Sequence, residues 1–292
     1  MDVRHLRYFL AVVDLGSVNK AAAALHVAQP SLSQAIRALE RDLGIDLFRR
    51  AGRRLVLTDA GEALIGPARQ VVRVLATARA SVAEVADLRV GRVEIAAMPS
   101  QSVEPLARII KAVTEKHPGL SIAVRSAFTA EDVVDEVRSG RTELGLLGAS
   151  EPVCDSRVRV TPLGTQRFVL VCPHGGPFAP DAVVRHEDLA GQRLIVGQPG
   201  TGMRRVVDEI SARADITPVV ETEHREAILP LVLGGVGMAV LAESWAPLAR
   251  QAGALVLALE PARYLHLALV AGPGDLSPAA SAFLDVAHSL NL

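Results

Sequence analysis

The sequence contains few of the residues on which several classes of protein depend. Cysteine occurs only at Cys154 and Cys172 in 292 residues, and this pair alone builds neither a disulfide framework nor a zinc site. We expect both thiols to be buried and inert; a redox switch is the alternative. Aromatic residues make up only 3% of the chain, which argues against a stacking site for a large flat cofactor. No metal ion and no cofactor is therefore predicted.

A long hydrophobic run is missing as well. The longest apolar stretch covers residues 229–242, and Pro230 and several glycines interrupt it. A helix that spans a bilayer needs about 20 apolar residues, so this stretch is too short and too broken to cross one. No apolar export segment follows Met1. We therefore expect a cytoplasmic protein that does not bind a membrane.

Neither sign of charge is in clear excess over the whole chain, since the formal net charge is −1. The two ends differ, however. Residues 1–90 contain 13 Lys and Arg against 9 Asp and Glu, a net charge of +4, whereas residues 91–292 contain 18 against 23, a net charge of −5. The length of the chain allows two domains. A basic N-terminal part followed by an acidic remainder indicates two functions, and the basic part can bind phosphate.

Residues 1–58, which we call the head, show the pattern of three short helices and two short strands. Apolar residues at helical spacing predict helices over residues 5–14, 18–25 and 30–43. Ser17 is a suitable N-cap for the second helix. Pro30 in the first turn and Gly44 after the last turn suit the two ends of the third helix.

The third helix separates into an apolar face and a polar face. The apolar residues that must face the core of the head are Leu32, Ile36, Leu39 and Leu43. On the opposite face lie Pro30, Gln34, Arg37 and Arg41, with Ser31 and Ser33 at its margins. Glutamine can pair with adenine and arginine with guanine through two hydrogen bonds, and serine can reach phosphate or a base edge. This face predicts a helix that enters the major groove of DNA; a solvated surface is the alternative.

A basic hairpin is predicted after the third helix. Residues 47–57 alternate apolar residues with arginine and glycine, as two short strands around a basic tip do. The arginines of this hairpin are Arg49, Arg50, Arg53 and Arg54. Such a tip can lie on phosphates or enter a minor groove. Two helices joined by a tight turn and followed by a basic hairpin indicate a winged helix-turn-helix DNA-binding domain over residues 1–58.

A long linker helix is predicted over residues 59–89. Thr58 can cap it, and Asp59 and Glu62 lie in its first turn, where the helix dipole favours acidic side chains. An apolar stripe at alternating spacings of four and three residues runs through Leu64, Ala68, Val71, Leu75, Ala78, Val82 and Val85. We expect this stripe to pair two copies of the chain; packing against its own chain is the alternative.

From residue 90 onward, strands alternate with helices. The first series predicts strands over residues 93–97, 120–124 and 144–147, with helices over 101–115 and 130–139 between them. A second series begins near residue 168, and a strand over 265–271 and a helix over 278–290 close the chain. The first series, β-α-β-α-β, predicts a parallel sheet with helices on its faces. We expect lobe I over residues 90–161 and 264–292, lobe II over 162–263, and a cleft between them.

The N-terminal residues resemble one known family closely. The resemblance rests on LRYFLAVV at residues 6–13, GSV at 16–18, KAA at 20–22, LHVAQPSLS at 25–33, Ile36, LE at 39–40, LG at 43–44, LFRR at 47–50 and LTDAG at 57–61. These residues look like the N-terminus of the LysR-type transcriptional regulators. The match is close over about 60 residues, and a long helix followed by two α/β lobes agrees with the family to the end of the chain.

The resemblance implies a mixed fold and a set of partners. It implies a winged helix-turn-helix head, a linker helix that pairs the chain into homodimers and commonly homotetramers, and a periplasmic-binding-protein-like effector domain over residues 90–292. The residues that it implies at the DNA are Gln29, Pro30, Ser31, Ser33, Gln34 and Arg37, with Arg53 or Arg54 in the wing. Many relatives carry a basic residue in place of Gln34, so their base preference at that position does not transfer.

In this family the effector lies between the lobes, beside helix N-termini that follow the first strands. The residues of this chain at such positions are Ser100, Gln101, Ser102, Thr129, Gly148 and Thr201. Free backbone N–H groups, a helix dipole and hydroxyl groups suit a carboxylate or another anion. For Ser102 a role as a helix cap alone is the alternative. His224 and Arg225 can also touch an anion, although a surface position is the simpler interpretation.

The sequence contains no pattern that indicates catalysis, because no nucleophile stands with its base and no ligands converge on a metal. We therefore expect a transcriptional regulator and not an enzyme. Its partners would be double-stranded promoter DNA, a small anionic metabolite and further copies of itself, with an effect on recruitment of RNA polymerase. A constitutive architectural DNA-binding protein is the first alternative. An enzyme or solute-binding protein with a vestigial head is the second.

Overall fold

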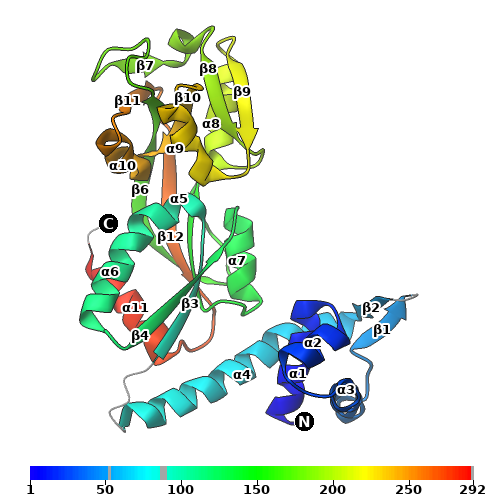
Figure 1. Ribbon diagram of the computed structural model, residues 1–292. Helices are drawn as coiled ribbons and strands as arrows, with labels where there is room; N and C mark the ends of the chain where they lie inside the picture. The colour runs from blue at the N-terminus through cyan, green and yellow to red at the C-terminus, as the bar shows by residue number, and fades with distance from the viewer. Residues whose placement is uncertain (52–53, 86–90, 291–292) are drawn as a thin grey trace. The chain divides into compact units, whose positions relative to one another are not determined.

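The computed structural model describes residues 1–51, 54–85 and 91–290 (Figure 1). The chain divides into two compact units, formed mostly by residues 1–91 and by residues 92–292. No helix in the described part of the chain is long and apolar enough to cross a bilayer.

The first unit contains the predicted helices and hairpin of the head, followed by a long helix. Its elements are α1 (Val3–Leu15), α2 (Val18–Ala24), α3 (Gln29–Leu43), β1 (Phe48–Ala51), β2 (Arg54–Leu57) and α4 (Asp59–Val85). The strands β1 and β2 pair antiparallel from Phe48 opposite Leu57 to Ala51 opposite Arg54. The fully buried side chains at the centre of the head are Leu6, Phe9, Val12, Ala21, Leu32, Leu39 and Leu47.

Local sequence sets the helix ends of the head. The side chain of Ser17 accepts a hydrogen bond from the backbone of Lys20 at the start of α2, as predicted. Gly16 and Gly44 end α1 and α3 in the left-handed conformation, with φ of 63° and 70°, which glycine adopts without a steric penalty. The prediction that Leu43 faces the core is wrong, because this residue in the last turn is 39% exposed.

Thr58 joins the start of α4 to the start of the hairpin. Its hydroxyl donates a hydrogen bond to the carbonyl of Asp46 at 2.7 Å and accepts one from the backbone N–H of Gly61 at 3.1 Å. Its own N–H donates to the carbonyl of Leu47 at 3.0 Å. The predicted cap therefore also fixes the hairpin against α4.

The apolar stripe of α4 is used in two ways. Leu64 and Ala68, near the start of the helix, pack against the core of the head, which was the alternative interpretation of the stripe. Further along, Val71 and the neighbouring Val74 are exposed, Val74 by 59%. The side chains of Val82 and Val85 lie outside the described residues. The helix spans 27 residues, or about 40 Å at 1.5 Å per residue.

The second unit is an α/β structure whose helices lie about one long sheet (Figure 1). Its first half contains β3 (Gly91–Ala97), α5 (Pro99–Gln101), η1 (Ser102–Leu106), α6 (Ala107–Lys116), β4 (Leu120–Ser126), α7 (Ala130–Arg138) and β5 (Leu144–Ala149). The prediction of one continuous helix over residues 101–115 is wrong. Glu104 has an extended backbone, with φ −157° and ψ 130°, because the residue before a proline, here Pro105, is disfavoured in the helical region.

The second half adds the remaining strands and helices. They are β6 (Arg159–Cys172), β7 (Val183–Arg185), η2 (His186–Leu189), β8 (Arg193–Gly197), α8 (Gly202–Ser211), β9 (Thr217–Thr222), α9 (Arg225–Leu233), β10 (Met238–Ala242), η3 (Glu243–Trp245), α10 (Ala246–Gln251), β11 (Leu255–Glu260), β12 (Tyr264–Ala271) and α11 (Pro278–Ser289). The short strand β7, the helix α10 and the strand β11 are absent from the sequence prediction.

The parallel pairing predicted for the first series is present between β3 and β5, but the sheet also contains antiparallel pairs that the sequence did not predict. The strand order is β4-β3-β5-β12-β6-β10-β8-β9, and β3 with β5 and β8 with β9 and β10 are parallel. The long strand β6 pairs antiparallel with β10, β11 and β12. The three residues between β11 and β12 are too few for the crossover that parallel neighbours need, so both strands run in succession along β6.

The two cysteines differ in exposure. Cys172 is buried in β6, and burial raises the pKa of its thiol to about 12, so it is inert as expected. Cys154 is exposed, and the expectation that it is buried is wrong. Among the residues that the structure describes, no group of three or more His, Cys, Asp or Glu side chains is placed to hold a metal ion.

Candidate nucleic-acid interface and effector site

The helix α3 presents its polar face to solvent and its apolar face to the core. Leu32 and Leu39 are fully buried and Ile36 is nearly so. The residues predicted at the DNA that are exposed are Gln29, Pro30, Ser31, Gln34 and Arg37, while Ser33 is partly buried. Pro30 lies in the first turn, where its missing N–H leaves no helical bond unmade.

The side chains on this face differ in how far they are already engaged. Gln29 Nε2 donates a hydrogen bond to Ser33 Oγ at 2.9 Å. Gln34 and Arg37 take part in no side-chain hydrogen bond or ion pair with the described residues. Their amide and guanidinium groups therefore keep their full hydrogen-bonding capacity for a partner outside the chain.

Glu40 fixes the hairpin beside α3. Its Oε1 atom accepts hydrogen bonds from the backbone N–H groups of Leu47 at 3.0 Å and Phe48 at 3.3 Å. The ring of Phe48 lies 5.5 Å from that of Phe9, centroid to centroid, and so anchors the first strand in the core. A carboxylate on the helix and an aromatic ring under the strand thus hold helix and hairpin in one arrangement.

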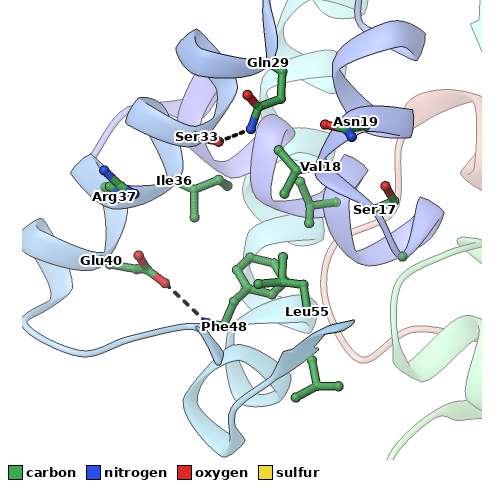
Figure 2. Close-up of a pocket in the computed structure, with 13 residues that line it drawn as sticks. Ser17, Val18, Asn19, Gln29, Ser33, Ile36, Arg37, Glu40, Phe48 and Leu55 are labelled. Carbon is green, nitrogen blue, oxygen red and sulfur yellow. Dashed lines mark hydrogen bonds between the residues drawn. The ribbon is translucent and has the colours of Figure 1, made fainter. Parts of the chain in front are cut away.

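A groove of about 740 Å³ lies between the start of α2, the helix α3 and the hairpin (Figure 2). Its apolar side chains are Val12, Val18, Ile36, Phe48, Leu55 and Val56, and its polar ones are Ser17, Asn19, Gln29, Ser33, Arg37 and Glu40. Ser17 and Asn19 were not predicted as site residues. Only the packing of α2 against α3 brings them beside Gln29 and Ser33, so no local pattern could have indicated them.

The basic tip is only partly described. Arg49 is exposed on β1. Arg53 lies outside the described residues, and so does the side chain of Arg54, whose backbone begins β2. Their contact with phosphate stays a prediction.

The residues predicted at the effector follow the ends of β3 and β5. Ser100 and Gln101 come after β3 and are both buried, and Gly148 is near the end of β5. The amide of Gln101 is fully buried, and neither its Nε2 nor its Oε1 has a hydrogen-bond partner. A Cβ atom at Gly148 would lie 2.7 Å from Gln101 Nε2, so a larger residue there would displace this amide from its present position.

Three of the predicted hydroxyl groups are engaged in the backbone around them. Ser102 Oγ donates to the carbonyl of Met98 at 3.1 Å. Thr129 and Asp132 form a reciprocal cap at the start of α7, with two hydrogen bonds of 3.0 Å. Thr201 Oγ1 accepts from the N–H of Arg204 at 3.3 Å and donates to the carbonyl of Gln198 at 3.0 Å. Each hydroxyl therefore has a structural role whether or not a ligand binds.

Three hydrogen bonds join the ends of β3, β4 and β5 to elements from the second half of the unit. Ser244 Oγ in η3 donates to the carbonyl of Ser100 at 3.4 Å. Arg225 Nη2 in α9 donates to the carbonyl of Phe128, after β4, at 3.2 Å. Arg205 in α8 donates to the hydroxyl of Ser150, after β5. The segments that follow these strands thus contact elements from the second half of the unit.

The expectation that Arg225 lies on the surface is wrong. Its side chain is only 5% exposed, and burial lowers the pKa of its guanidinium. The adjacent His224 is exposed and pairs with Glu226 at 3.3 Å, so only the arginine of this pair enters the interior.

Comparisons with known proteins agree with the predicted resemblance. Residues 3–62 match the family described as bacterial regulatory helix-turn-helix protein, lysR family, and residues 86–290 match the LysR substrate binding domain. The chain is 28% identical over 270 residues to the uncharacterized HTH-type transcriptional regulator YnfL of Escherichia coli (strain K12). The aligned region covers 86% of this chain and 89% of YnfL. It is 25% identical over 235 residues to the HTH-type transcriptional activator CmpR of a Synechocystis species. That aligned region covers 80% of this chain and 76% of CmpR.

Solved structures show the same fold over the whole chain. A full-length OxyR variant from Pseudomonas aeruginosa matches with a TM-score of 0.74 and 21% identity, over 100% of this chain and 95% of that one. Full-length CbnR in complex with its target DNA matches with a TM-score of 0.65 and 21% identity, over 99% of both chains. These relatives are regulators and not enzymes. The chain belongs to the LysR family of transcriptional regulators, DNA-binding proteins that join a helix-turn-helix head to a substrate-binding domain.

Proposed function

We propose that α3 reads DNA sequence in the major groove through its polar face. The observation that carries this proposal concerns the side chains of Gln34 and Arg37. They are exposed, form no hydrogen bond or ion pair with a described residue and lie opposite the buried leucines of the same helix. Arg37 suits guanine and Gln34 suits adenine. The residues proposed to contact phosphates or base edges around them are Gln29, Pro30, Ser31 and Ser33. The similarity to CbnR, whose structure was solved in complex with its target DNA, supports the same use of the head.

We propose that Arg53 and Arg54 at the hairpin tip bind phosphates without reading bases. The logarithm of the binding constant falls linearly with the logarithm of the salt concentration. Each phosphate contact that is lost makes this slope shallower by about 0.9. Replacing both arginines by alanine should therefore weaken binding to every DNA sequence and reduce the slope by about 2. Gel-shift titrations over a salt series, on the chain's own promoter region and on unrelated DNA, measure both quantities.

The control variant carries Arg193→Ala and Arg250→Ala, which removes two exposed arginines from the substrate-binding domain. It should keep the salt slope of the parent chain. A wing variant whose slope equals that of the parent chain would contradict the proposed phosphate contacts. If the parent chain does not bind its promoter region at all, the proposal for α3 fails as well.

We propose that a small anionic metabolite binds at the ends of the first strands of the substrate-binding domain. The residues proposed to surround it are Ser100, Gln101, Ser102, Thr129, Gly148 and Thr201. The buried, unpartnered amide of Gln101 supports this location, because a buried amide without partners is costly unless something supplies them. The α8 N-terminus, capped by Thr201, offers backbone N–H groups that suit an anion. A change in how the lobes close would then alter the assembly of the heads and recruitment of RNA polymerase.

A thermal-unfolding screen of the full chain against anionic metabolites tests the effector proposal. A ligand at 100 times its Kd adds about 2.7 kcal/mol, which should raise the Tm of a unit of this size by about 5–10 °C. If no metabolite raises the Tm while promoter binding persists, the chain is instead a constitutive architectural DNA-binding protein.

We further propose three domains and a dimer. The domains are the head over residues 1–58, the linker helix over 59–89 and the effector domain over 90–292, with lobe I over 90–161 and 264–292 and lobe II over 162–263. The exposed Val71 and Val74 on α4 support pairing through this helix into homodimers and then homotetramers. Light scattering of the purified chain tests the oligomeric state. Because its target is chromosomal DNA, we propose a cytoplasmic location.

A further inference from the structure

Arg225 is a buried cation that lacks an anionic partner. It is the first residue of α9, its side chain is 5% exposed, and it forms no ion pair with any described residue. The acidic residues nearest in sequence do not compensate it. Glu226 pairs with His224 in solvent, and Glu223 is exposed.

The single hydrogen bond of Arg225 leaves most of its guanidinium without a partner. Nη2 donates to the carbonyl of Phe128 at 3.2 Å, which uses one of five N–H groups. A buried charge costs free energy unless it is paired, and a carbonyl dipole replaces only part of the hydration that a guanidinium loses. The lowered pKa of this group has burial as its cause. A site of this kind is completed by an anion with two acceptor oxygens, which matches the planar fork of arginine.

A second unpartnered group lies at the sheet edge that also carries the acceptor of Arg225, since the N–H of Ala127 after β4 donates to the carbonyl of Ala97 at the end of β3. Phe128, the acceptor of Arg225, follows β4, and Gln101, whose amide is fully buried without partners, follows the neighbouring strand β3. Thr129 stands next to Phe128 in the chain. Two buried polar side chains without sufficient partners therefore lie at the same edge of one sheet.

We propose that Arg225 is the counter-ion of the effector and that it selects a carboxylate or another oxoanion over the corresponding neutral amide. This inference rests on the effector site proposed above and names the residue that sets its charge preference. The guanidinium turns its unused N–H groups to two oxygens of the anion, while the carbonyl of Phe128 keeps it in position. The competing interpretation is that Arg225 only ties α9 to the end of β4.

The fluorescence of Trp245 is the signal chosen to follow binding. This residue is the only tryptophan of the chain, it is nearly buried, and the preceding Ser244 bonds to the carbonyl of Ser100. Its fluorescence is followed while the full chain is titrated with acetate, malonate, benzoate and inorganic phosphate, each up to about 20 mM at constant ionic strength. Acetamide, malonamide and benzamide serve as neutral counterparts. The variants are Arg225→Gln, Arg225→Lys and the control Arg250→Gln, which removes an exposed arginine of α10.

We expect at least one anion to give a saturable change with the parent chain and with Arg250→Gln, and none of the amides to do so. Arg225→Gln should raise the Kd by about 10- to 100-fold, the usual effect of losing a charged hydrogen-bonding partner. Arg225→Lys keeps the charge but not the planar fork, so its Kd should lie between that of the parent chain and that of Arg225→Gln. If Arg225→Gln does not fold, as judged by circular dichroism, the lysine variant alone decides, since a merely structural tie predicts an unchanged Kd.

Three results would overturn the inference. The first is that none of the four anions saturates with the parent chain. The second is that the anion Kd of Arg225→Gln, or of Arg225→Lys where the glutamine variant is unfolded, equals that of the parent chain. The third is saturation by the neutral amides with equal Kd in the parent chain and in Arg225→Gln, which would leave the proposed effector site standing. Promoter binding is measured separately, so failure of the proposed DNA function is distinguishable from each of these results.

Discussion

Replacing Gln34 and Arg37 together by alanine should abolish most of the sequence preference of the protein while leaving its binding to unrelated DNA largely intact. Each two-hydrogen-bond pair between a side chain and a base contributes about 1–3 kcal/mol of discrimination. Losing both should therefore reduce the ratio of specific to nonspecific affinity by about 100-fold or more. The fold should not change, because both side chains are exposed and engaged by no described residue.

The measurement is a competition gel shift between the promoter region and unrelated DNA at one fixed salt concentration. A matched control carries Arg4→Ala and Arg7→Ala, which removes two exposed arginines of α1 in the same head. The control should keep the specificity ratio of the parent chain. An unchanged ratio in the Gln34 and Arg37 variant would mean that the base-reading face of the head lies elsewhere.

The helices of the head could be predicted because their determinants are local. The spacing of Leu32, Ile36 and Leu39 identifies the buried face of α3, and the left-handed Gly16 and Gly44 end two helices within one residue of the prediction. The prediction that Leu43 is buried fails for a related reason. Periodicity shows that Leu43 lies on the same helix face as the buried leucines, but it does not show that the core ends before the last turn of the helix.

The substrate-binding domain is less predictable because its pairings are distant in sequence. Alternating strands and helices indicated two α/β halves, but not the short link that makes β11 and β12 run in succession along β6. The break in the helix near Glu104 did carry a local signal, since Pro105 disfavours helical backbone before it.

The burial of Arg225 had no local signal at all. Its position at the start of α9 suggests a solvated charge, and its neighbour His224 is indeed exposed. The arginine donates a hydrogen bond to Phe128, which follows β4 and lies 97 positions earlier in the chain. Candidate site residues that depend on such contacts can be found only when the structure brings the segments together.

Replacing Gly61 by alanine should destabilise the head and weaken its binding to all DNA. A Cβ atom at this position would lie 2.3 Å from the carbonyl oxygen of Leu47 and 2.7 Å from a methyl group of Leu57. That carbonyl accepts the N–H of Thr58, so it cannot move without breaking the junction between hairpin and α4. Overpacking of this kind costs about 1–3 kcal/mol. Amide exchange over residues 47–58 should therefore accelerate by about 10- to 100-fold.

Gly66 in the same helix is the matched control for this substitution. A Cβ atom there would meet nothing within 4 Å, and alanine favours a helix over glycine by about 1 kcal/mol. Gly66→Ala should therefore leave amide exchange of the hairpin unchanged or slow it, with DNA affinity preserved. Equal exchange rates in the two alanine variants would show that the contact between Gly61 and Leu47 does not fix the hairpin. Faster exchange in Gly61→Ala with unchanged DNA affinity would show that DNA binding does not need the hairpin in this position.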